Sequence, residues 1–166
     1  MGILNIIRYP NPVLRKKCKA VNKVDAKIKK LINDMIETMH TAPGIGLAAP
    51  QVGHNIRLIV VDIGEGAFSM INPKIKKKNK LLQSFDEGCL CLPGIVGPVE
   101  RPSQVTVEGL DKNGEPMTIE AVGFLATVLQ HEIDHLDGIV FIDRVKDKSL
   151  IREVSRKEEE EKGELL

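Results

Sequence analysis

The chain has 166 residues, of which 42% are hydrophobic, a size that suits one domain over residues 1–166 with a buried core. Its 24 lysines and arginines nearly balance 23 aspartates and glutamates, which excludes a strong overall field toward nucleic acid or an anionic membrane surface. Three cysteines and an amino terminus without a long apolar core favour a reducing, cytoplasmic setting, and no apolar run is long enough to span a membrane.

A first helix is expected after Asp25, whose side chain can accept hydrogen bonds from the free N–H groups of a first turn. Apolar side chains then recur every three or four residues: Ile28, Leu31, Ile32, Met35, Ile36 and Met39. Pro43 and Gly44 end this pattern. Residues 44–51 are small and rich in glycine, which suits close approach of the backbone to a ligand or metal, and equally suits tight packing between a helix and a strand.

Short runs of apolar and β-branched residues predict strands. These runs are residues 57–63, 70–75, 104–110 and 117–122. Asn113 and Gly114, between the last two runs, are a strong signal for a hairpin turn. Residues 139–142 are expected to form a further strand, and residues 148–161 a C-terminal helix with a weak apolar stripe.

The candidate chemistry lies in residues 124–138, where apolar residues again recur at helical spacing and Gly138 supplies a stop. His131 and His135 lie one turn apart on such a helix, so both imidazoles can reach one metal ion. Glu132 beside them can take a proton from a water molecule bound to that metal. The expected fold class is therefore α+β, with mixed or antiparallel β-sheets packed around a central metal-binding helix, an N-terminal helix and a C-terminal helix.

Two histidines and a glutamate also occur on ordinary polar helix faces, so a catalytic metal site needs a third ligand. A third histidine six residues after the second defines one metalloprotease class, but Phe141 occupies that position. Glu153 would complete the two-histidine, one-glutamate set of another metallopeptidase class. The third possibility lies upstream in residues 87–91, Glu-Gly-Cys-Leu-Cys. A further alternative is a closed, structural metal site made by cysteine and the histidines, for which Cys91 is the candidate fourth ligand.

Three segments together resemble the signature motifs of the peptide deformylase family, and they occur in the same order as in that family. They are residues 44–51 (Gly-Ile-Gly-Leu-Ala-Ala-Pro-Gln), 87–90 (Glu-Gly-Cys-Leu) and 130–138 (Gln-His-Glu-Ile-Asp-His-Leu-Asp-Gly). The resemblance, which covers nearly the whole chain, implies that Cys89, His131 and His135 hold one divalent metal ion. That ion would be ferrous iron in the cell, and zinc, nickel or cobalt could replace it. The implied reaction removes the formyl group from N-formylmethionine at the start of newly synthesised polypeptides and releases formate.

The resemblance also implies roles for the residues around the metal. Glu132 would move a proton from water to the leaving nitrogen, while the Gln51 side chain and the Leu90 N–H would hold charge on the formyl oxygen. Gly46 and its neighbours would pair with an extended peptide, and Glu87 would fix nearby groups. The candidates for a methionine pocket are Ile45, Phe85, Phe124 and Val128.

Two features depart from the family pattern. Cys91 stands where serine is usual, and its thiol could bind the metal or oxidise, although the similar size of the two residues favours a harmless substitution. Some relatives dock on the ribosome through a basic C-terminal helix, whereas residues 158–161 are glutamates here and would be repelled by RNA phosphate. Transient contact with the ribosome is therefore not expected to use this segment.

Overall fold

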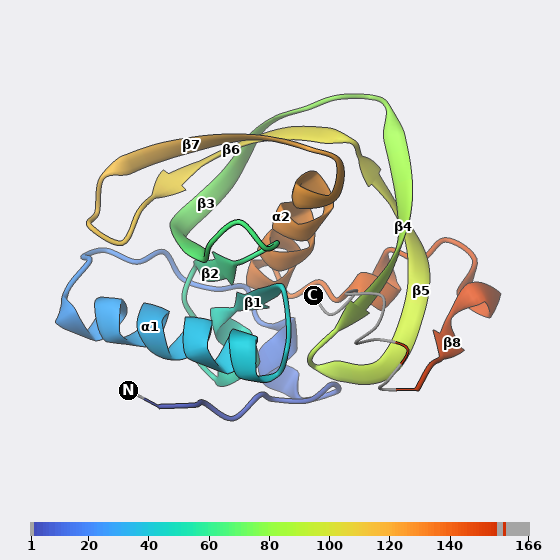
Figure 1. Ribbon diagram of the computed structural model, residues 1–166, viewed down its shortest axis with the longest axis horizontal. Coiled ribbons are helices and arrows are strands. Elements are labelled where there is room, and N and C mark those ends of the chain that lie inside the picture. Colours follow the sequence, from blue (N-terminus) through green and yellow to red (C-terminus); the bar gives the residue numbers. More distant parts are fainter. Residues whose placement is uncertain (1, 156–157, 159–166) are drawn as a thin grey trace.

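The computed structural model describes residues 2–155 and residue 158. Over these residues the chain forms two α-helices, a five-stranded sheet in the order β1-β2-β3-β6-β7 and a three-stranded sheet in the order β4-β5-β8 (Figure 1). All pairs within these sheets are antiparallel, which confirms the α+β class. The strands are β1 Gly46–Ala48, β2 Leu58–Val61, β3 Phe68–Lys78, β4 Leu82–Cys89, β5 Leu92–Pro102, β6 Gln104–Leu110, β7 Pro116–Val122 and β8 Arg152–Glu153. Neither helix is both long enough and apolar enough to cross a bilayer over the described ranges.

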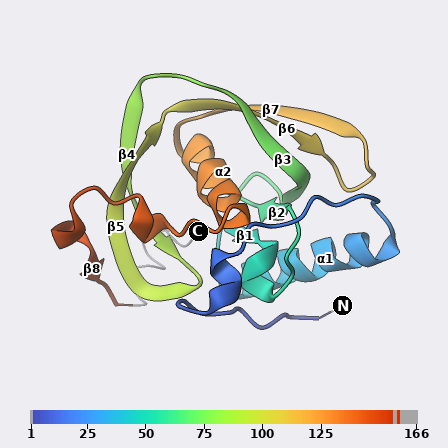
Figure 2. The ribbon, with the colours of Figure 1, turned by 180° about the vertical axis from the view of Figure 1, so that it is seen from behind.

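Helix α2 (Gly123–Leu136) lies at the centre of the molecule, between the arch of β3, β6 and β7 and the β4–β5 pair (Figures 1 and 2). Ten of its 14 residues are buried, so neighbouring elements pack on nearly every side of it. The helix ends just before Gly138, which has a φ of 74° and where a Cβ atom would overlap the backbone of Arg15. Glycine at this position lets the N-terminal segment pack directly against the C-terminal end of α2.

Helix α1 (Ala26–Thr41) begins where the sequence predicts it, because the Asp25 side chain accepts a hydrogen bond of 3.0 Å from the Ile28 N–H. Its apolar face packs against β1 and β2 in one core cluster. That cluster includes Leu31, Ile32, Met35, Met39, Leu47, Leu58 and Val60. The same cluster contains Ala49, so α1 supports both β1 and the short 3-10 helix Ala49–Val52 that follows it.

Four of the predicted strands form, with β2 shorter than residues 57–63 and β3 longer than residues 70–75. Strands β6 and β7 are the predicted hairpin. In its turn the Gly114 N–H donates to the Asp111 carbonyl at 2.9 Å, and the Asp111 side chain accepts from the N–H groups of Asn113 and Glu115. The turn chemistry therefore sets the register of this hairpin.

Two predictions for the C-terminal part of the chain are wrong. Residues 139–142 do not form a strand, because Phe141–Asp143 is a 3-10 helix closed by a 3.0 Å hydrogen bond from the Val140 N–H to the Asp143 side chain. The expected helix over residues 148–161 is replaced, as far as residue 155, by the 3-10 helix Lys148–Leu150 and strand β8. Pairing with the edge of β5 satisfies backbone groups there, and Ile151 packs into the adjoining core, which outweighs the weak helical stripe. Beyond residue 155, only position 158 of that expected helix lies within the described residues.

Candidate active site

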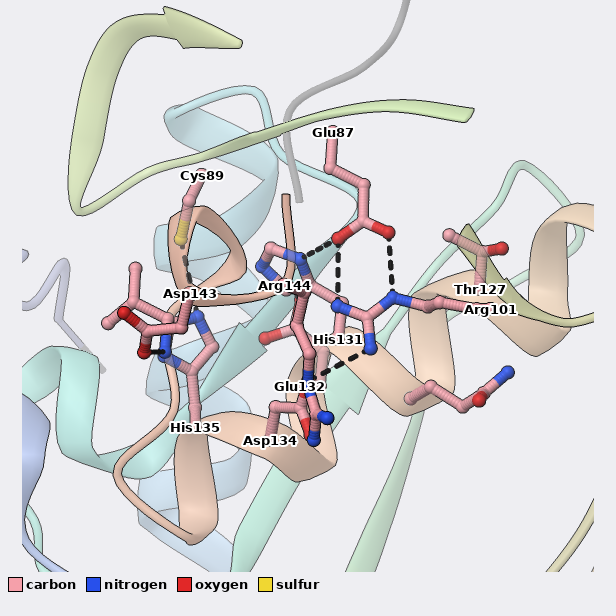
Figure 3. A network of polar contacts seen from close by, with 12 residues as sticks. Glu87, Cys89, Arg101, Thr127, His131, Glu132, Asp134, His135, Asp143 and Arg144 are labelled. Carbon is pink, nitrogen blue, oxygen red and sulfur yellow. Dashed lines mark hydrogen bonds and ion pairs between the residues drawn. The ribbon is translucent and has the colours of Figure 1, made fainter. Parts of the chain in front are cut away.

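Cys89, His131 and His135 meet in the interior of the protein. Cys89 ends β4 and both histidines lie on α2, so segments distant in sequence form one cluster (Figure 3). Their ligand atoms all lie within 4.8 Å of one another, and Cys89 Sγ is 3.3 Å from His135 Nε2. Each of the three residues is at most 1% exposed. The structure thus brings together the ligand set that the family resemblance implies.

The state of these side chains fits a metal ion. His131 Nδ1 is hydrogen-bonded to Glu87 at 2.8 Å, whereas His131 Nε2 is buried without a hydrogen-bond partner among the described residues. Burial lowers the pKa of His135 well below its ordinary value and keeps the imidazole neutral, as a metal ligand must be. Burial also raises the pKa of the Cys89 thiol in the metal-free chain, so metal binding would release a proton there. A thiol and two imidazoles suit a divalent transition metal.

A network of ions fixes the outer side of His131 (Figure 3). The Glu87 carboxylate, which accepts from His131, also accepts from Arg101 Nε at 2.7 Å and Nη2 at 3.0 Å. Arg101 Nη1 donates to Asp134 at 2.9 Å, and Asp134 in turn accepts from Arg144. Burial would raise the pKa of Glu87, but the hydrogen bonds from His131 and Arg101 outweigh it and lower that pKa below its ordinary value. Glu87 therefore remains a carboxylate that orients the His131 ring.

Sequence reasoning found Glu87 but missed Arg101, Asp134 and Arg144. The sequence could have indicated Asp134, since it lies three residues after His131 and so faces the same side of the helix. Nothing in the sequence places Arg101 in the site, because an arginine at the end of an apolar strand ordinarily points to solvent. Its 4% exposure follows from a position between β5 and α2 that only the fold creates.

Glu132 follows His131 on α2 and is fully buried. Both of its carboxylate oxygens are buried and lack a hydrogen-bond partner within the described part of the chain, and Oε2 is 4.0 Å from His131 Nε2. Burial raises the pKa of Glu132 to about 7. A carboxyl group with such a pKa can both accept and release a proton near neutral pH.

Gly46 makes the space that Glu132 occupies. A Cβ atom at this position would overlap the Glu132 carboxylate, with the carboxyl carbon only 2.8 Å away. Because both residues are buried, neither can move out of the way without disturbing the site. The glycine predicted to meet the peptide therefore also admits the acidic side chain.

We expect Gly46→Ala to lower kcat/KM by about 100-fold, because the added methyl group displaces the Glu132 carboxylate by a large fraction of an ångström or more. Steady-state kinetics on metal-loaded protein would measure this loss. Gly2→Ala is the matched control, since a Cβ at Gly2 meets no atom within 4 Å. Equal activity of the two variants would show that Glu132 tolerates displacement.

Gln51 and Leu90 approach the metal ligands from two further elements. Gln51, in the 3-10 helix after β1, is fully buried; its Oε1 accepts from the Ala48 N–H at 2.8 Å, and its Nε2 donates to Cys89 Sγ at 3.4 Å. The amide group thus has a fixed orientation with its donor side toward the ligand cluster. Leu90 directly follows Cys89 in the turn between β4 and β5, and its side chain covers Gly44.

The residues expected to line a methionine pocket are also neighbours. Val128 is buried in the core cluster against which Ile45 and Phe124 pack, and the Phe85 and Phe124 rings meet edge to face with centroids 5.5 Å apart. Phe85 and Phe124 are only partly buried, so this apolar surface is accessible from outside the core. Their role as a methionine pocket stays a prediction.

The two alternatives for the metal set do not agree with the structure. Glu153 is exposed on β8, where it pairs with Ile95, and it does not belong to the ligand cluster. Cys91 Sγ lies 3.2 Å from Cys89 Sγ, but no fourth histidine, cysteine or carboxylate of the described chain shares the 4.8 Å range of the other ligand atoms. Three protein ligands leave a coordination position open, as in catalytic rather than structural sites.

A buried Cys-His-His cluster, beside a glutamate that has no hydrogen-bond partner among the described residues, is typical of metal-dependent hydrolases. The model of the polypeptide deformylase family matches residues 3–150. The chain therefore belongs to this family, whose known function is removal of the formyl group from N-terminal formylmethionine.

Individual relatives agree with this assignment. The peptide deformylase of Symbiobacterium thermophilum is 49% identical over 163 residues, covering 96% of this chain and 75% of the relative, and that of Pelotomaculum thermopropionicum is 47% identical over 159 residues, covering 96% and 100%. Among solved structures, the peptide deformylase of Thermotoga maritima superposes with a TM-score of 0.86 at 42% identity, covering 87% of this chain and 99% of that one. A complex of the Synechococcus elongatus enzyme with actinonin has a TM-score of 0.86 at 40% identity, covering 98% and 87%.

Proposed function

We propose that the chain deformylates N-formylmethionyl peptides and nascent chains, with Cys89, His131 and His135 holding one divalent metal ion. The observation that carries this assignment is the buried Glu132 carboxyl group beside the ligand cluster, which has no hydrogen-bond partner in the described part of the chain. When bound, the metal would supply Lewis-acid chemistry by lowering the pKa of a bound water and polarising a carbonyl group. We assign ferrous iron as the metal in the cell and expect zinc, nickel or cobalt to substitute, because thiolate and imidazole ligands accept several metals and availability decides among them.

Glu132 would act as the proton carrier of the reaction. Its carboxylate takes the proton from the attacking water and later delivers it to the amine nitrogen as the bond to the formyl carbon breaks. Burial raises the pKa of Glu132 to about 7 in the metal-free chain and a bound metal would lower it, so the group is a carboxylate that can take up a proton near neutral pH. The closed surroundings of Glu132 limit exchange of this proton with bulk water.

Gln51 and Leu90 would stabilise the charge that develops on the formyl oxygen. The Gln51 amide is held by the Ala48 N–H, so its NH₂ group is already oriented before substrate arrives. The Leu90 backbone N–H lies next to the Cys89 ligand and would supply a second donor. Donors fixed in advance stabilise a transition state without the cost of reorganisation.

The peptide would bind along β1. This strand pairs with β2 on one side and is the edge of its sheet, so an extended peptide can add to its other side at Gly46. The methionine side chain would then reach the apolar surface formed by Ile45, Phe85, Phe124 and Val128. Backbone pairing accepts varied side chains after the first residue, which suits an enzyme acting on many nascent chains.

A cytoplasmic setting is part of the proposal. It is supported by three cysteines that are free thiols in the structure. Transient ribosome contact stays a prediction, and binding of ribosomes by the full chain and by a variant ending at residue 146 would test whether the C-terminal segment takes part.

The function is tested by formate release from a formyl-Met-Ala-Ser peptide, using anaerobically purified protein loaded with ferrous iron. We expect rapid release, and none from Cys89→Ala, which loses a metal ligand. Metal content and circular dichroism establish that the variant is folded but metal-poor. No release from folded, iron-loaded wild-type protein would reject the assignment.

We expect Gln51→Ala to lower kcat by about 10²–10³-fold, equivalent to roughly 2.7–4 kcal/mol of lost transition-state stabilisation, with little change in KM. Steady-state kinetics on equally metal-loaded proteins would measure both constants. Gln51→Glu keeps the size and the acceptor but not the amide donor, and it should be similarly impaired. Unchanged turnover in Gln51→Ala would remove this residue from the mechanism.

A further inference from the structure

Two thiols face each other at the ligand cluster. Cys89 Sγ and Cys91 Sγ are 3.2 Å apart, and both residues are fully buried. Cys89 ends β4 and pairs with Leu92 at the start of β5, and Cys91 is the second residue of the two-residue turn between them. A disulfide bond needs the sulfurs about 2.0 Å apart, so the remaining approach is little more than 1 Å.

The surroundings favour a disulfide over other oxidised forms. Both cysteines belong to an apolar cluster with Leu14, Val99 and Phe141. A disulfide is uncharged and suits such a cluster, whereas a sulfinate or sulfonate would place a negative charge in it. Cys18, the third cysteine, packs in a different core cluster.

We propose that Cys89 and Cys91 form a dithiol that hydroperoxides oxidise reversibly to an intramolecular disulfide whenever the metal is absent. One sulfur attacks the peroxide, the O–O bond breaks, and the sulfur becomes a sulfenic acid as water (or an alcohol) leaves. The second sulfur then attacks the sulfenic sulfur, the S–O bond breaks and a second water leaves. Two thiols and one hydroperoxide thus give one disulfide, and a dithiol reductant reverses the change by thiol–disulfide exchange.

The disulfide and the metal exclude each other, because Cys89 cannot be a thiolate ligand and a disulfide sulfur together. This exclusion of the metal rests on the proposed function, which makes Cys89 a metal ligand. The formation of a disulfide between Cys89 and Cys91 does not depend on the proposed function. Cys91 would then protect the site: it captures an oxidised Cys89 in a form that reduction repairs.

The test exposes full-length protein to hydrogen peroxide in two forms, metal-free and zinc-loaded, followed by alkylation of free thiols under denaturing conditions and mass spectrometry. In the metal-free form we expect the mass of two hydrogen atoms to be lost, a Cys89–Cys91 linkage in the peptide map, and only Cys18 to be alkylated. Dithiothreitol should restore all three thiols and zinc binding together. The zinc-loaded form should keep its three thiols far longer.

Two variants separate the roles of the cysteines. Cys18→Ser should still form the disulfide, whereas Cys91→Ser should gain oxygen atoms at Cys89 that dithiothreitol does not remove. Irreversible oxygen gain in wild-type protein, or a disulfide that includes Cys18, would overturn the dithiol. Because mass and thiol counts need neither substrate nor turnover, these readouts stand even if deformylation fails. A Cys89–Cys91 disulfide that left zinc binding unchanged would instead overturn the exclusion of the metal.

Discussion

Glu132→Gln is expected to retain its metal and to lower kcat/KM for a formylated peptide by about 10²–10⁴-fold. Glutamine has nearly the same shape as glutamate, so it fills the space beside Gly46, but its amide cannot accept the proton from water. The loss should therefore appear in turnover and not in metal content. Formate release and elemental analysis on the same preparation measure the two quantities.

Surface carboxylates offer a matched control for this experiment. Glu120 is exposed on β7, and Glu120→Gln should leave kcat/KM unchanged. A Glu132→Gln enzyme that kept more than a tenth of wild-type activity would rule out the proton-carrier role.

The pH profile of the wild-type enzyme gives a further check. Burial raises the pKa of Glu132 to about 7 in the metal-free chain, and the positive charge of a bound metal would lower it from there. Since the base form is needed to take up the proton, kcat/KM should rise with pH through this lowered value and level off above it.

Among the substitutions considered, Arg101→Met should cause the largest loss of stability, a decrease of about 3–5 kcal/mol in the free energy of unfolding. Arg101 is 4% exposed and supplies both hydrogen bonds that balance the fully buried Glu87 carboxylate from the β5 side. Methionine fills much of the volume but leaves that charge without its cationic partner. Urea unfolding of wild-type and variant protein at equal metal loading would measure the difference.

The stability difference between wild-type protein and Arg101→Met should depend on pH. In the wild type the pKa of Glu87 is lowered, so its contribution is complete above the ordinary glutamate value of about 4.3 and is lost as pH falls through the folded-state pKa. In the variant, burial without Arg101 should raise the pKa of Glu87, so the free energy of unfolding falls as pH rises. The difference in unfolding free energy between the two proteins should thus be largest near neutral pH and smaller as the medium becomes acidic.

Two control variants isolate the buried charge. Adding Glu87→Gln to Arg101→Met removes the uncompensated carboxylate and should recover most of the lost stability. Lys146→Met breaks an exposed pair with Glu100, in which the side chains are 75% and 47% exposed, and should have only a small effect. If Lys146→Met and Arg101→Met were equally stable, the buried network would contribute no more than a surface pair.

Local sequence patterns predicted the elements whose determinants lie within a few neighbouring residues. Asp25 and the apolar repeat after it define α1, Asn113 and Gly114 define the β6–β7 turn, and the spacing of His131 and His135 places two ligands on one helix face. In each case the decisive contacts join residues at most four positions apart along the chain. Such contacts form the same way in many tertiary settings.

Elements that depend on distant partners were missed or misassigned. Residues 139–142 have the composition of a strand, but Asp143, which caps them in a 3-10 turn, is held by Arg15 from the amino-terminal segment, and the edge of β5 draws Arg152–Glu153 into a strand. The β4–β5 hairpin lacks a strong turn signal, and nothing local marks Leu90 and Cys91 as its turn. The secondary structure of such segments depends more on the neighbouring strand or loop with which they pair than on their own propensities.

The sequence by itself determined helices α1 and α2, the ligand types and, through the family motifs, the pairing of Cys89 with the two histidines. Only the tertiary structure decided that Arg101 is buried against Glu87, that Gly46 makes room for Glu132, and that the Cys89 and Cys91 thiols touch. The physical reason is that burial, and with it the pKa of Glu132 and the balance of charge around Glu87, depends on elements that approach from remote parts of the chain.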